Sequence, residues 1–121
     1  DWSVILDSTV DVVNFDAYEF GVGITLYADH LRRFFDRGGI LAWGIVPTNE
    51  AVIEEDYHSL TKRLEALFER LQAKGFERTE ILKHAMITPS CGTGSLPIAL
   101  AEEIFTKTVE VSHHIRDLYF S

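Results

Sequence analysis

The residue best able to do chemistry in this sequence is Cys91, which lies in the stretch ITPSCGTGSLP at positions 87–97. It is the only cysteine among 121 residues, so it cannot form a disulfide within the chain and its thiol is free. A cysteine thiolate acts as a nucleophile or as a metal ligand, whereas a buried cysteine is a small apolar filler. The elements around Cys91 decide between these interpretations.

Three short segments rich in β-branched and aromatic residues predict strands at 10–18, 40–48 and 84–88. Each is followed by a segment whose apolar residues recur every three or four positions, which predicts a helix. The helices are expected at the beginning of the chain, at 23–39, at 49–75 and from Pro97 onward. A helix followed by three strand-helix units is typical of an α/β fold with a parallel sheet.

Polar residues occur where the predicted strands end. In parallel α/β folds the carboxyl ends of the strands lie at one edge of the sheet, where ligands bind. Asp16, Asn49 and Cys91 each end or follow a predicted strand, so we expect them at this edge. Side chains alternate along a strand, which puts Asn14 on the same side as Asp16. Asn14 and Asn49 are therefore candidate contacts to a substrate.

Three motifs, VDVVNFDAYEF, GGILAWGIVPT and TPSCGTGSL, occur in this order along the chain. With these separations the sequence resembles the C-terminal part of cobalamin-independent methionine synthases, in the superfamily that also holds the uroporphyrinogen decarboxylases. The resemblance implies a partial TIM (β/α)8 barrel, with three C-terminal βα units preceded by a short helix. Residues 1–121 would then be a C-terminal fragment of such a barrel, and we expect the start of the chain to be cut from something longer.

The resemblance also implies a zinc site. Methyltransferases of this family hold zinc with a His-x-Cys pair, a carboxylate and a final cysteine, and here Asp16 matches the carboxylate and Cys91 the cysteine. Zinc with an open position deprotonates a thiol such as homocysteine, which then accepts a methyl group in methionine biosynthesis. The His-x-Cys pair would lie before Asp1, so we expect the fragment alone to be inactive.

Two other functions stay open. The first is a metal-free enzyme like uroporphyrinogen decarboxylase, in which Asp16 contacts an acidic substrate; against it, the three strand-end segments contain no Lys or Arg. The second is a non-catalytic subdomain that self-associates, because a three-stranded sheet has two open edges that another copy, or the rest of the barrel, would cover. Asp16 also has a structural alternative, as the cap of the turn that follows it.

The charge of the chain limits its partners. Eleven Lys and Arg against nineteen Asp and Glu give a formal net charge of −8, which repels nucleic acid and anionic lipid. No apolar run approaches the roughly 18 residues of a membrane span. We therefore expect a cytoplasmic protein whose partners are a small thiol and a methyl donor, with neither nucleic acid nor membrane involved.

The five histidines are predicted to lie outside the site. His113 and His114 are neighbours on a predicted helix, so they cannot face the same way. His30 and His58 fall on outer helices, and His84 precedes its strand and belongs at the opposite end of the sheet. We expect all five to be surface or second-layer residues.

Overall fold

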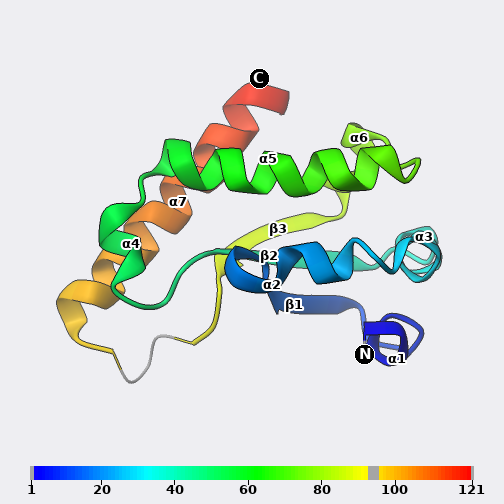
Figure 1. Cartoon of the computed structure of the whole chain (residues 1–121), viewed down its shortest axis with the longest axis horizontal. Coiled ribbons are helices and arrows are strands. Elements are labelled where there is room, and N and C mark those ends of the chain that lie inside the picture. Colours follow the sequence, from blue (N-terminus) through cyan, green and yellow to red (C-terminus); the bar gives the residue numbers. More distant parts are fainter. Residues whose placement is uncertain (1, 93–95, 121) are drawn as a thin grey trace.

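Helices and strands alternate in this computed structural model, which describes residues 2–92 and 96–120. Three strands form one sheet, and helices pack against it (Figure 1). The strands are β1 (Val12–Asp16), β2 (Ile40–Val46) and β3 (Ala85–Pro89). The helices are α1 (Trp2–Leu6), α2 (Ala17–Ile24), α3 (Ala28–Asp36), α4 (Ala51–Glu54), α5 (Tyr57–Ala73), α6 (Arg78–Lys83) and α7 (Ile98–Phe120).

The strands run in the order β1-β2-β3 and all are parallel. Their carboxyl ends therefore lie at one edge of the sheet, as predicted from the sequence. Figure 1 shows α4 and the segment after β3 at this end, with α1, α3 and α6 at the opposite end. We call the first end the carboxyl edge and the second the amino edge.

The expectation of a partial TIM (β/α)8 barrel, with three βα units preceded by a short helix, is wrong. The structure shows a small open sheet, with two helices between β1 and β2 and three between β2 and β3. A barrel requires a sheet that closes on itself with matching strand tilt and stagger. This sheet stays open, because its two outer strands, β1 and β3, each pair only with β2. Only the coarser prediction of an α/β fold with a parallel sheet is therefore confirmed.

The core lies between the sheet and its helices. Phe15, Trp43 and Phe68 stack edge to face from β1 through β2 to α5, with 5.1 Å between successive ring centres. The opposite face of the sheet is less covered, since Val12 and Met86 are each 49% exposed. Parallel sheets are ordinarily buried on both faces. This sheet therefore keeps one partly bare face, which carries the side chains that alternate with the core residues.

Glycine ends two helices where the sequence predicts it. Gly38 and Gly75 follow α3 and α5 with φ of +87° and +101°, a backbone region open to glycine but costly for other residues. The helix expected at 23–39 corresponds to α3, whereas α2 before it was not predicted; the single helix expected at 49–75 is instead α4 and α5. The Thr25 hydroxyl donates to the carbonyl of Val22 at 2.7 Å, a local bond that competes with helix continuation. Helix α6 was not predicted, because its six residues are too few to show a period.

The C-terminal helix α7 has 23 residues and packs on β3 and α5. Its buried contacts come from Ile104, Val111 and Ile115. The rest of the helix carries both charged and apolar side chains; the exposed large apolar residues are Ile98, Phe105, Val109, Leu118 and Phe120. Among the helices of residues 2–92 and 96–120, none combines the length and apolar character needed to cross a membrane.

Candidate functional site

The end of β1 and the segment after β3 both pack closely against Gly44 at the carboxyl edge. Gly44 is a buried residue of the central strand and pairs in register with Asp16 of β1. A Cβ built on Gly44 would lie 2.5 Å from the carbonyl oxygen of Phe15 and 2.8 Å from the Cα of Ser90. Phe15 and Ser90 directly precede Asp16 and Cys91. The missing side chain at Gly44 therefore lets the two segments that carry the candidate ligands approach each other.

Cys91 is exposed, and its thiol contacts the hydroxyl of Thr48. Its Sγ lies 2.6 Å from Oγ1 of Thr48, which in turn is 3.2 Å from Oγ of the buried Ser90. Ser90 N donates to the carbonyl of Val46 at 2.8 Å, so the ends of β2 and β3 are held together. An exposed thiol is not a core filler. Sequence reasoning missed Thr48 and Ser90, although Thr48 directly follows Pro47 at the end of a predicted strand.

Asp16 takes the structural role that the sequence left open. It is the N-cap of α2, and its Oδ1 accepts a hydrogen bond from the backbone N–H of Glu19 at 3.0 Å. Such a cap satisfies one of the free N–H groups at the start of a helix. The cap uses one carboxylate oxygen, so Oδ2 is the atom that could bind a metal ion or substrate.

The two asparagines predicted to contact a substrate also have structural partners. Asn14 Nδ2 donates to Oγ1 of Thr88 at 3.0 Å, which links β1 to β3 across β2, where Asn14 pairs with Ala42 and Thr88 with Gly44. Asn49 Oδ1 accepts from the backbone N–H of Ala51 at 2.9 Å, at the beginning of α4. Both asparagines are exposed. Each can therefore contact a bound molecule while it keeps its local bond.

Glu55 forms the most connected polar cluster near this edge. Its carboxylate accepts from the hydroxyls of Tyr18 (2.6 Å) and Ser59 (2.5 Å) and from Nε of Arg63 (3.1 Å). Burial alone would raise the pKa of Glu55, but the hydrogen bonds and the Arg63 charge outweigh it and lower that pKa. The bond to Glu55 raises the pKa of Tyr18. The cluster fixes α2, which begins directly after Asp16, against α5.

The donors at the carboxyl edge fit part of a zinc site. A soft thiolate and a carboxylate are both ligands that Zn2+ accepts. Cys91 and Asp16 supply one of each, but no group of three or more His, Cys, Asp or Glu side chains within residues 2–92 and 96–120 is placed to hold a metal ion. Part of the predicted Gly-rich turn, residues 93–95, lies outside the described residues. A complete site would need ligands from beyond the described part of the chain.

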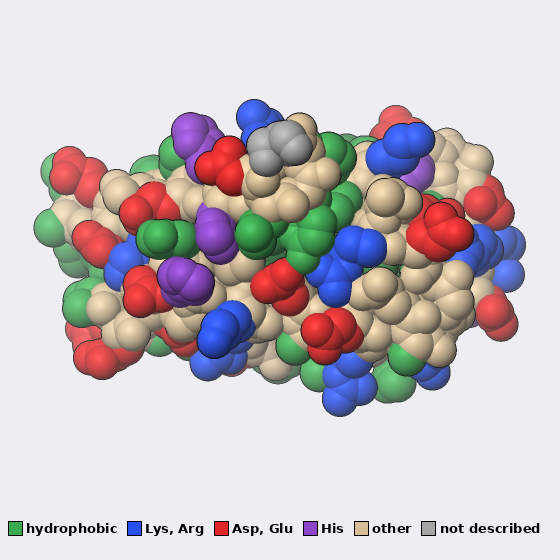
Figure 2. Space-filling model, turned by 90° about the horizontal axis from the view of Figure 1, so that it is seen from above, with side chains coloured by type: hydrophobic (Ala, Val, Ile, Leu, Met, Phe, Trp, Pro, Cys, Tyr) green, Lys and Arg blue, Asp and Glu red, His purple; other side chains and the backbone are tan. Residues whose placement is uncertain are grey.

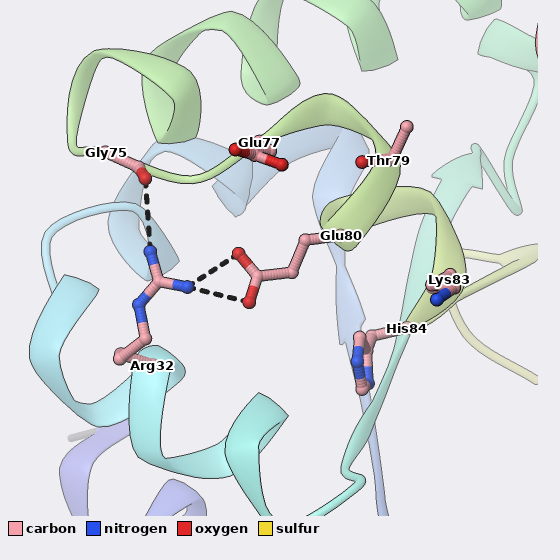
Figure 3. A pocket seen from close by; sticks show the side chains of 7 residues that line it. All are labelled: Arg32, Gly75, Glu77, Thr79, Glu80, Lys83 and His84. Carbon is pink, nitrogen blue, oxygen red and sulfur yellow. Dashed lines mark hydrogen bonds and ion pairs between the residues drawn. The ribbon is translucent and has the colours of Figure 1, made fainter.

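A pocket of about 490 Å3 lies at the amino edge, away from these residues. Figure 3 shows that Arg32 faces Glu80 across it, with Nη1 at 2.6 and 2.7 Å from the two carboxylate oxygens. Arg32 Nη2 also donates to the carbonyl of Gly75, and the guanidinium lies 4.1 Å from the centre of the Phe76 ring. The Arg32 charge is thus used to join α3 to α6, and the pocket has a structural role.

Comparison of the chain with protein-family models, with curated proteins and with solved structures finds no match. The likeness to methionine synthases therefore depends on the three sequence motifs alone. Any function must be argued from the residues at the carboxyl edge.

Proposed function

We propose that this chain forms part of a zinc-dependent active site that transfers a methyl group to a small thiol such as homocysteine. The observation that supports the proposal is the convergence at Gly44, where the segments carrying Asp16 and Cys91 come together. Zinc, when bound, supplies a Lewis acid that favours the thiolate form of the substrate near neutral pH. Only the thiolate attacks a methyl donor, so this is the chemistry that methyl transfer to a thiol requires.

Each residue of the carboxyl edge has a role in this proposal. Cys91 and Asp16 are the protein ligands that this chain contributes. With Cys91 as a thiolate, the Thr48 hydroxyl is the donor of their hydrogen bond and fixes the position of the sulfur. The exposed amides of Asn14 and Asn49 bind polar groups of the substrate. Further ligands come from outside the described residues, so the chain alone is inactive. A free thiol as ligand fits a reducing compartment such as the cytoplasm.

Zinc content tests the proposal. The protein and its Cys91→Ser variant are equilibrated with the same concentration of free Zn2+, and the zinc bound to each is measured by atomic emission. We expect less zinc in Cys91→Ser, while Gly92→Ala, the neighbouring position with nothing within 4 Å of an added Cβ, keeps the wild-type content. Homocysteine binding by calorimetry, with homoserine as the control that lacks the thiol, tests the substrate class. Equal zinc in wild type and Cys91→Ser would refute the ligand assignment.

The partly bare sheet face favours a second candidate, a non-catalytic domain that associates with another copy of itself. Val12 and Met86 expose about half of their surface on the two edge strands of this face. Burying such apolar surface favours association. Light scattering across a range of concentrations should then show a dimer that Met86→Lys dissociates. A monomer at every concentration would exclude this candidate.

A further inference from the structure

Two histidines from different helices lie side by side where α5 packs on α7. His58 is in the first turn of α5 and His114 in the second half of α7, and their ring centres are 5.4 Å apart. Tyr57 packs against both, with ring centres 5.3 Å from His58 and 5.1 Å from His114. Figure 2 shows histidine side chains gathered on this surface of the molecule. We call these three residues the ring cluster.

The separation of the two imidazoles matches that of two ligands on one metal ion. With Zn–N bonds of about 2.0 Å and tetrahedral angles, the ring centres of two coordinating imidazoles are about 5 Å apart. The observed 5.4 Å differs by a few tenths of an ångström, and the planes are inclined by 52° rather than stacked. We propose that His58 and His114 bind a divalent transition-metal ion such as Zn2+, each through one ring nitrogen.

The surroundings of the pair suit a hydrated cation. Glu110 lies one turn before His114, and Glu65 lines a second pocket together with His58 and His114. Glu110 attracts a cation, whereas Glu65 is already paired with Arg78 at 3.6 Å and accepts a hydrogen bond from Tyr119. Lys62 in the second pocket opposes cation binding in part. The pockets measure about 270 and 320 Å3, which leaves room for water. Since the described residues provide no third protein ligand, water completes the coordination.

This inference does not depend on the proposed function, because it involves other residues on other elements. A metal ion bound here would join α5 to α7. It binds the folded chain and not the unfolded one, so it stabilises the fold in proportion to the logarithm of its concentration. The thermal midpoint should therefore rise with zinc, a readout that needs no enzymatic activity.

The experiment uses Cys91→Ser protein, which lacks the thiol of the carboxyl edge. An absence of zinc binding would therefore count against the histidine site and not against the proposed role of Cys91. Zn2+ is titrated by calorimetry, and thermal unfolding is followed with Zn2+ or with chelator. We expect one ion per chain and a rise in the thermal midpoint. His58→Gln and His114→Gln should each weaken binding on the order of tenfold or more, since one of two protein ligands is lost. His30→Gln, on α3 and away from both pockets, is the control and should bind as before.

Two results would overturn the inference. One is that Cys91→Ser protein takes up no zinc. The other is that His58→Gln or His114→Gln binds zinc as tightly as their parent. Both histidines are exposed or half-exposed, so the substitutions should leave folding intact, and circular dichroism without zinc checks this.

Discussion

Replacing Gly44 with Ala should strongly destabilise the fold. The added Cβ would meet the carbonyl oxygen of Phe15 at 2.5 Å, the Cα of Ser90 at 2.8 Å and the carbonyl oxygen of Pro89 at 2.9 Å. All three are backbone atoms, so none can rotate away as a side chain does. The ends of β1 and β3 must instead move away from β2.

The size of the effect follows from these contacts. Overpacking a buried site by a methyl group costs about 1–3 kcal/mol, and backbone neighbours put Gly44 at the upper end, about 3 kcal/mol. Gly21 provides the matched comparison, because its added Cβ would also approach an atom to 2.5 Å, but that atom is Cδ1 of the Leu67 side chain. Leu67 can change rotamer, and Ala gains about 1 kcal/mol over Gly within a helix. Gly21→Ala should therefore change stability little.

Urea unfolding, followed by the fluorescence of Trp2 and the buried Trp43, measures the difference. A loss of about 3 kcal/mol lowers the urea midpoint by roughly 1–2 M and the thermal midpoint by about 12 °C. Gly92→Ala, where the added Cβ meets nothing within 4 Å, should unfold as wild type does. If Gly44→Ala unfolds at the wild-type midpoint, the strands do not converge there, and the geometric support for the zinc proposal is lost.

Three further substitutions test individual interactions. Because the pKa of Glu55 is lowered in the folded chain, its ionisation contributes stability in full above about pH 4.3, and this is lost as pH falls through the folded-state pKa. Glu55→Gln should thus lower the free energy of unfolding by about 1–2 kcal/mol at pH 7. Urea unfolding should show that the difference in stability between wild type and variant becomes smaller below about pH 4. A difference that does not depend on pH would contradict this prediction. Arg32→Lys should lower the stability measured by thermal unfolding by about 1 kcal/mol, because lysine cannot bond Glu80 and the Gly75 carbonyl through two nitrogens and loses the contact with the Phe76 ring. The control Arg33→Lys, at an exposed position, should have no measurable effect. Equal effects of the two substitutions would contradict this prediction. Trp43→Phe should cost less than about 2 kcal/mol against about 3–5 kcal/mol for Trp43→Ala, because the buried Trp43 Nε1–H has no hydrogen-bond partner among the described residues; equal losses in chemical unfolding would show that this group is satisfied.

The sequence predicts elements where the signal is local. The run ILAWGIV is continuously apolar because β2 is the central strand, and all of it except Ile40 is buried. Gly38 and Gly75 end helices because their own backbone angles require it. Closure of the sheet is not local, since it depends on how many strands pair and at what tilt. The partial-barrel prediction went wrong at this step.

The same division applies to the candidate site. Asp16 and Cys91 could be assigned to one edge because parallel strands end together. The contact of Cys91 with Thr48 and the meeting of His58 with His114 could not be predicted. Each joins segments far apart in sequence, and each depends on the relative shift of packed elements, which hydrophobic periodicity does not encode.

The two edges of the sheet differ in how their polar groups are used. At the amino edge, side chains are tied to backbone carbonyls: Arg37 donates to Leu6 and Val10, and His84 Nδ1 lies 2.8 Å from the carbonyl oxygen of Gly39. At the carboxyl edge, Cys91 and the asparagines stay exposed. A binding site needs accessible donors on a rigid support. Gly44 supplies the support, because it lets the strand ends pack closely beneath side chains that remain open to a ligand.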